Sequence, residues 1–147
     1  MDDVDIRVLK ELSEDARLSY REIARRTGLA VGTVASRIAN LEKTGVIKGY
    51  SPVLDAEKLG YDIVAIIEVV VAKGKLLDVE EKVAENPSVY GVYDVTGPSD
   101  AIVIARFKTR GELSQFVKSI LSMEYVDRTI THVALGTMKE DFRLPVE

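Results

Sequence analysis

The chain has 147 residues, of which 46% are apolar and 30% are charged, enough for one ordinary domain or two small ones. It has no cysteine and one histidine, which excludes disulfides and thiolate or histidine-rich metal sites. Its longest apolar stretch, Ile63–Ala72, contains Glu68 and is about half of the ~20 residues that a membrane-spanning helix needs. The acidic N-terminus does not resemble a signal peptide, so we expect a cytoplasmic protein without a membrane segment.

The formal net charge of −4 comes entirely from residues 61–147. Residues 1–60 hold ten basic and ten acidic side chains and are neutral on balance. Within this neutral part, the stretch 17–37 contains five arginines and the single acid Glu22. A local basic surface of this kind is what phosphate binding requires, whatever the total charge.

Residues 1–45 have the pattern of three short helices. Apolar residues from Ile6 onward recur at helical spacing in the first. The second begins at Ser19-Tyr20-Arg21-Glu22, a capping box in which each side chain accepts from the other residue's backbone N–H, and ends at Gly28. The third ends before Gly45 and carries three stacked apolar residues on one face: Val34, Ile38 and Leu41.

The second and third helices, joined by a short turn that contains glycine, match a DNA-binding helix-turn-helix over residues 19–44. Small and hydrogen-bonding side chains lie opposite the apolar stripe of the third helix, where they suit a major groove. We expect DNA contacts from Tyr20, Arg21, Arg25, Gly32, Thr33, Ser36, Arg37, Asn40 and Lys43. The alternative for Arg37 is an ion pair with an acid such as Asp5 or Glu42.

The pattern changes after Gly45. Val46–Leu54 is expected to form a short strand pair or wing, and the polar stretch 55–61 leads out of the first domain. We therefore predict domains of residues 1–60 and 61–147, with the boundary near Gly60.

The second domain alternates strands and helices. Ile63–Ala72 is nearly continuous in β-branched residues, which predicts a strand buried on both faces. A helix, two strands joined by a turn, a second helix and a last strand follow, at 77–86, 89–95, 101–107, 113–121 and 129–135. The order β-α-β-β-α-β predicts an α+β protein whose second domain is a ferredoxin-like sandwich.

The residues also resemble a known family, the Lrp/AsnC or "feast/famine" transcriptional regulators. The resemblance covers essentially the whole chain and rests on the runs Asp15-Ala16-Arg17-Leu18-Ser19, Glu22-Ile23-Ala24-Arg25-Arg26-Thr27-Gly28-Leu29, Gly45-Val46-Ile47-Lys48-Gly49-Tyr50 and Val95-Thr96-Gly97-Pro98-Ser99-Asp100. It implies an N-terminal winged helix-turn-helix that binds double-stranded DNA. It also implies a C-terminal domain that forms dimers, often tetramers or octamers, and binds an amino-acid effector.

Carried over from the family, the effector turn (residues 97–100) lines the effector cleft. Its four members are Gly97, Pro98, Ser99 and Asp100, and Thr129 and Thr131 are weaker candidates for a facing wall. No cofactor or metal is implied. The alternative reading of Asp100 is that it only stabilises the turn, and His132 reads as a sheet residue rather than a ligand.

Two departures from the family pattern bear on these expectations. Ala30 stands where the family usually has a serine before the third helix, and alanine cannot cap a helix. Pro98 and Ser99 replace acidic or aromatic residues in the effector turn. Two other functions remain open: an enzyme subunit like the siroheme decarboxylases, which share this architecture, and an effector-sensing module that no longer binds specific DNA.

Overall fold

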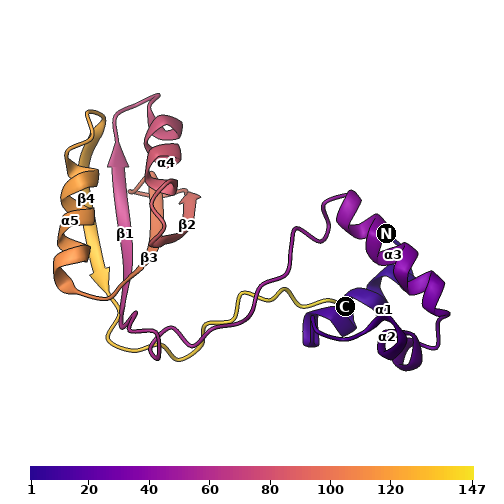
Figure 1. Ribbon diagram of the computed structural model, residues 1–147. Helices are drawn as coiled ribbons and strands as arrows, with labels where there is room; N and C mark the ends of the chain where they lie inside the picture. The colour runs from indigo at the N-terminus through magenta and orange to yellow at the C-terminus, as the bar shows by residue number, and fades with distance from the viewer. The chain divides into compact units, whose positions relative to one another are not determined.

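The structure is a computed structural model that describes residues 1–147. The chain divides into two compact units, the first made of Met1–Val53 with Lys139–Glu147 and the second of Leu54–Met138. Each unit has its own hydrophobic core. The first three helices of the chain belong to the first unit and the whole sheet belongs to the second, as can be followed in Figure 1. The domain boundary near Gly60 stays a prediction, because Gly60 lies in the connection between the last helix of the first unit and the first strand of the second.

The three helices of the first unit are α1 (Asp3–Glu14), α2 (Tyr20–Thr27) and α3 (Val31–Lys43). Their apolar faces meet in one core, as the spacing predicts, and the fully buried members are Val8, Ile23, Val34 and Ile38. α2 ends at Gly28, whose φ of 70° is the left-handed conformation that a glycine adopts without strain.

The helix starts differ in part from the expectation. Ser19 caps α2 by accepting from the backbone N–H of Glu22 at 3.2 Å, but the Glu22 side chain does not reach back. The predicted capping box is therefore wrong in its second half, because two arginines compete for that carboxylate. A reciprocal capping box forms instead at α1, between Asp2 and Asp5.

The expected strand pair at Val46–Leu54 is wrong for the single chain, because no strand forms between α3 and the sheet. The segment is irregular, and Val53 is 84% exposed. A strand requires a partner for its backbone groups, and Pro52 has no N–H to donate. No other strand lies beside this segment, and Ile47 instead donates its backbone N–H to Leu41 of α3 at 3.1 Å.

The second unit is a four-stranded antiparallel sheet in the order β2-β3-β1-β4. The strands are β1 (Ile63–Val71), β2 (Val89–Asp94), β3 (Ala101–Phe107) and β4 (Val126–Val133), and the helices are α4 (Leu76–Ala84) and α5 (Arg110–Leu121). Buried residues of both helices pack with the sheet in one core. The predicted β-α-β-β-α-β sandwich is confirmed.

The two faces of the sheet differ. Along β1, Ala65, Ile67 and Val69 are buried under the helices, whereas Ile66 on the opposite face is 38% exposed. The prediction that both faces of this strand are buried is therefore wrong for the single chain. We call the uncovered side the open face; by strand alternation it carries Ile66, Glu68, Val70, Tyr93, Ile102, Ile104, Ile130 and His132.

Candidate DNA-binding surface and effector turn

The outward side of α3 carries most of the predicted DNA contacts. Because Val34, Ile38 and Leu41 face the core, helical geometry turns the small and hydrogen-bonding residues toward solvent. Gly32, Ser36, Asn40 and Lys43 are all exposed, and Thr33 is half-buried beside them. One helix face thus displays hydroxyl, amide and ammonium groups that no protein element covers.

The first turn of α3 has no side-chain cap. Ala30 is the N-cap residue, with an extended backbone (φ −70°, ψ 145°), and makes no capping hydrogen bond. The first backbone N–H groups of a helix have no partner within the helix, so they remain available to water or to an anion. The first turn of α3 also lacks an acidic side chain that would compete for those donors.

The arginines of α2 are held by an acid. Arg25 donates to both carboxylate oxygens of Glu22, at 3.0 and 2.6 Å, and Arg26 donates to one of them at 2.9 Å. Arg26 also reaches Glu11 at 3.2 Å. These two guanidinium groups lower the pKa of Glu22 to about 2. The basic surface is thus partly neutralised within the protein, and the spacing of three and four residues from Glu22 was the sequence signal for it.

Arg37 has two acid partners from α1 and its cap. Its Nη1 donates to Asp2 at 2.7 Å and to Asp5 at 3.2 Å, and the Asp5 side chain is only 6% exposed. This is the kind of ion pair that the sequence offered as the alternative to a DNA contact. The pair joins the start of α1 to the middle of α3, so it orients the α3 helix in its unit.

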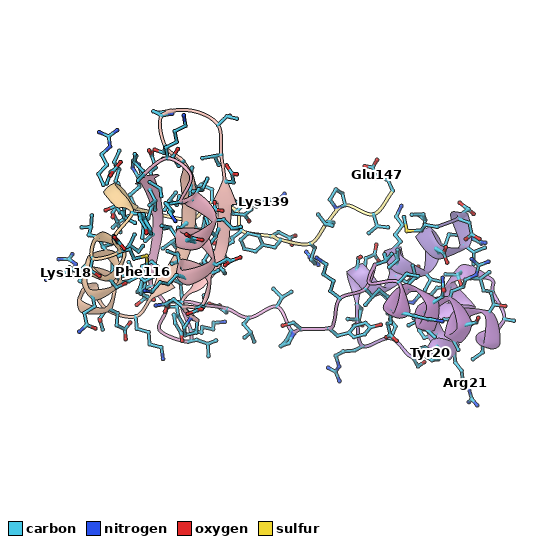
Figure 2. All side chains as sticks on the ribbon, turned by 90° about the horizontal axis from the view of Figure 1, so that it is seen from above. Tyr20, Arg21, Phe116, Lys118, Lys139 and Glu147 are labelled. Atoms are coloured by element: carbon cyan, nitrogen blue, oxygen red, sulfur yellow. The ribbon has the colours of Figure 1, made fainter.

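Tyr20 and Arg21 lie at the start of α2. Figure 2 shows both side chains at the surface of the first unit, and Tyr20 is 45% exposed. Arg21 forms no ion pair, unlike Arg25 and Arg26. Its positive charge therefore remains free for a phosphate.

The effector turn is tied to the end of β1. The carboxylate of Asp100 accepts from the backbone N–H of Val71 at 2.8 Å, and its own N–H donates to Val69 at 3.0 Å. Gly97 has a φ of 116° and is exposed, so its backbone is accessible. Asp100 thus has a structural task in the turn, and a role in binding effector stays a prediction.

A chain of hydrogen bonds leads from the turn onto the sheet. Ser99 is 6% exposed and its hydroxyl donates to Glu68 Oε2 at 2.6 Å. The other oxygen of Glu68 lies 3.0 Å from Nε2 of His132 on β4. Glu68 interrupts an apolar strand, and these two hydrogen bonds offset the cost of placing a carboxylate there.

The two candidate threonines of β4 lie on the other side of the sheet. Thr129 pairs with Val69 and Thr131 with Ile67, so alternation places them with the residues that face the helices. The single chain does not bring them together with Ser99, whose partner Glu68 is on the open face. Their role in binding effector stays a prediction.

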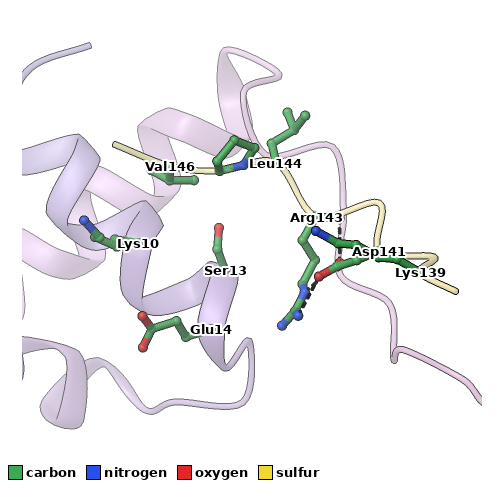
Figure 3. A pocket seen from close by; sticks show the side chains of 9 residues that line it. Lys10, Ser13, Glu14, Lys139, Asp141, Arg143, Leu144 and Val146 are labelled. Atoms are coloured by element: carbon green, nitrogen blue, oxygen red, sulfur yellow. Dashed lines mark hydrogen bonds and ion pairs between the residues drawn. The ribbon is translucent and has the colours of Figure 1, made fainter.

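A hollow in the first unit was not anticipated from the sequence. It measures about 440 Å³ and lies between α1 and the C-terminal segment, as Figure 3 shows. Asp141 holds Arg143 there through hydrogen bonds of 2.9 and 2.8 Å. No residue of α3 lines the hollow, so it is separate from the expected DNA surface.

Two family comparisons cover most of the chain. Residues 1–48 match the winged helix-turn-helix DNA-binding family, and residues 64–144 match the Lrp/AsnC ligand binding domain. The chain belongs to the Lrp/AsnC family. It is a transcriptional regulator with a DNA-binding helix-turn-helix and an Lrp/AsnC ligand-binding domain, as the resemblance implied. No helix is long and apolar enough to span a bilayer.

Related Lrp/AsnC proteins align over the full length. An HTH-type transcriptional regulator of Pyrococcus furiosus is 50% identical over 144 residues, 98% of this chain and 97% of the relative. The HTH-type transcriptional regulator FL11 of the same organism is 38% identical and covers 100% of this chain and 97% of its own length. These relatives are regulators, which favours regulation over the enzyme alternative.

Solved structures agree in fold. The crystal structure of the transcriptional regulator NMB0573 of Neisseria meningitidis in complex with L-Met has a TM-score of 0.88 and 29% identity, covering 99% of this chain and 96% of the other. The leucine response regulatory protein LrpA of Mycobacterium tuberculosis has a TM-score of 0.87 and 28% identity, with 100% of each chain covered.

Proposed function

We propose that this Lrp/AsnC protein binds specific DNA sequences through α3, assembles through the open face of its sheet and responds to an amino acid bound at the effector turn. The proposed DNA binding rests on the exposed face of α3. Ser36 and Asn40 lie on this face, opposite the apolar residues of the helix that pack in the core. An asparagine side chain bonds adenine with two hydrogen bonds in the major groove, and serine bonds either base edges or phosphates.

Positive groups around this face supply affinity without sequence preference. Arg21 carries a charge that no acid of the protein pairs with. The Arg25 guanidinium must release the Glu22 carboxylate before it binds a phosphate. Lys43, in the last turn of α3, is exposed as well. Contacts of this kind position the protein on the duplex, and the base-edge contacts specify the site.

The DNA proposal is tested by fluorescence anisotropy with two duplexes of equal composition, one from the DNA upstream of the protein's own gene and one scrambled. Asn40→Ala should reduce the preference for the upstream duplex by about 1–3 kcal/mol while scrambled binding persists. Arg21→Gln should weaken both duplexes alike and lower the salt slope by about 1.

Lys118→Gln is the matched control for the loss of one positive charge, since Lys118 is exposed on α5 of the other unit. It should bind both duplexes as the wild type does. Equal binding of both duplexes by the wild type, lost at moderate salt, would instead favour an effector-sensing module that no longer recognises specific DNA.

The open face supports self-association. Its exposed apolar side chains include Ile66 at 38%, Ile130 at 41% and Tyr93 at 50%. A sheet face of this kind is stabilised by burial against an equivalent surface, and a two-fold dimer presents two DNA-binding helices to one duplex. The oligomeric state follows from sedimentation equilibrium, and a monomer at micromolar concentration would refute this part.

The effector proposal rests on the ligand-binding domain match and on the Neisseria relative solved with L-Met. The exposed backbone at Gly97 offers N–H groups for a carboxylate. Thermal-shift measurements with each of the twenty amino acids test it, because a ligand that binds only the folded state raises the Tm. Asp100→Asn keeps an acceptor for Val71, so a loss of the shift in this variant separates ligand contact from turn stability.

A further inference from the structure

The effector turn and the open face are connected by the hydrogen bonds of Glu68. This side chain uses both carboxylate oxygens, one for the Ser99 hydroxyl of the turn and one for His132 on the edge strand β4. A carboxylate only accepts, so Nε2 of His132 carries the proton in this bond. Three elements that are distant in sequence, namely β1, the turn and β4, thereby share one polar group.

The surroundings of Glu68 make this connection strong. Within the sheet, Glu68 is paired with Ile102 on one side and with Ile130 on the other. The Ser99 end is 6% exposed, so water does not compete freely for the hydroxyl. The hydrogen bond from Ser99, followed by that from His132, lowers the pKa of Glu68, and the carboxylate therefore stays charged at neutral pH.

We propose that Glu68 and His132 are positioning residues that hold the effector turn through Ser99 and make self-association through the open face depend on pH. The inference rests on the proposed assembly, since it concerns the regulation of that same surface. The turn and the dimer then respond to one another, because any change in Glu68 acts on both.

The direction of the pH effect follows from the charges that face His132. Glu68 of β1 is its direct partner; Arg128 lies further along β4, Arg106 on β3 and Tyr93 on β2. Among side-chain types, histidine is the one whose charge ordinarily changes between about pH 5 and pH 8. His132 is the one histidine of the chain.

When a second copy covers the open face, the positive charge of a protonated His132 compensates the negative charge of the Glu68 carboxylate. A neutral His132 leaves the carboxylate without a cation in direct contact, and an uncompensated charge is costly to bury. Proton binding and association thus favour each other. Self-association is strongest at the acidic end of the interval and weakens as the pH rises.

The test is sedimentation equilibrium of the full chain from about pH 5.5 to about pH 8.5, compared with His132→Gln and with Gln115→Asn, at an exposed position of α5, as the control. The dimer Kd of the wild type and of Gln115→Asn should rise by roughly tenfold, which corresponds to about half a pKa unit of linkage at each of the two histidines of the dimer. His132→Gln keeps an N–H donor for Glu68 but does not titrate, so its Kd should be flat.

Hydrogen exchange followed by mass spectrometry tests the other end of the connection. Ser99→Ala and Glu68→Ala should each raise amide exchange in the effector turn several-fold, and Glu68→Gln, which still accepts from Ser99, should restore much of the protection. The Glu68→Gln dimer should also lose its pH dependence. Circular dichroism spectra of each variant verify that the sheet is folded, and Ser99→Ala, which removes only one hydroxyl from the turn, remains informative if a Glu68 variant does not fold.

The outcomes separate the two proposals. A wild-type dimer whose Kd does not change with pH, a His132→Gln dimer that keeps the full dependence, or turn exchange unaffected by Ser99→Ala would overturn the inference and leave the assembly intact. Absence of a dimer at every pH would refute the proposed assembly itself.

Discussion

The two units of this protein use charged side chains in different ways. In the first, acids hold arginines at an exposed surface: Glu22 binds Arg25 and Arg26, and the Arg25 side chain remains 72% exposed. In the second, one acid, Glu68, stands in a largely apolar face and binds a serine and a histidine. The exposed ion pairs of Glu22 can exchange partners at little cost in free energy. The two hydrogen bonds of Glu68 are directional and hold β1, the effector turn and β4 in position.

This difference matters for DNA binding and for assembly. Exposed ion pairs contribute little stability, so a phosphate can replace Glu22 beside Arg25 without unfolding anything. The acids of the first unit also moderate non-specific attraction to DNA, since each neutralises an arginine. The apolar surroundings of Glu68, by contrast, make its partners necessary once the face is covered.

The largest effect is expected from the buried face of the sheet. Ile67 is 0% exposed on the central strand β1, so Ile67→Ala should lower the free energy of unfolding of the second unit by about 2–5 kcal/mol. Urea unfolding followed by hydrogen exchange in each unit measures this loss. The neighbour on the opposite face is the control: Ile66→Ala should weaken dimerisation more than it weakens the fold of the unit.

A smaller loss is expected at the ion pair of the first unit whose acid is the most deeply buried, Asp5 at 6% exposure. Asp5→Ala removes the acceptor for the Asp2 N–H and one partner of Arg37, which should cost about 2 kcal/mol. Asp3→Ala is the control, since Asp3 is 88% exposed in its contact with Arg7. Equal losses in the two variants would show that burial of Asp5 has no bearing on the first unit.

Much of this fold could be predicted from local pattern. The apolar spacing in α3 and the alternation of strands and helices after Gly60 are properties of neighbouring residues, so period and turn residues are enough to identify them. The exposed face of α3 follows from the same spacing. The effector turn, in contrast, came from the family resemblance.

What could not be predicted depends on residues far apart in sequence. Arg37 and Asp2 are separated by 35 positions, and Glu68 and His132 by 64, so no local signal pairs them. The second half of the capping box at Ser19 was wrong because Glu22 had stronger partners in Arg25 and Arg26. The open face was missed because strand composition does not distinguish a face covered by helices from one that remains uncovered in the single chain.

A gain in stability is expected at the start of α3. Ala30 has the extended backbone of an N-cap residue but no side-chain acceptor, so Ala30→Ser should add about 0.5–1 kcal/mol to the first unit. Thermal unfolding of the variant measures the gain. The serine also takes one backbone donor away from an incoming phosphate, so a parallel rise in DNA affinity would mean that the cap orients α3 rather than competing with DNA.

The smallest change is expected at Glu22, and it appears only in acid. The two arginines lower the pKa of Glu22 from its usual 4.5 to about 2, so the ionised form is favoured in the folded state. Its contribution to stability is therefore complete above pH 4.5 and disappears as the pH falls toward 2. Glu22→Gln should unfold with a weaker pH dependence across this interval, as urea titrations at stepwise pH can measure. Glu14→Gln, an exposed carboxylate of α1 without an ion pair, should keep the wild-type dependence. The same Glu22→Gln change frees Arg25 and leaves Arg26 with Glu11 as its acid partner, so non-specific DNA affinity at neutral pH should rise; unchanged affinity would mean that Arg25 does not face the DNA.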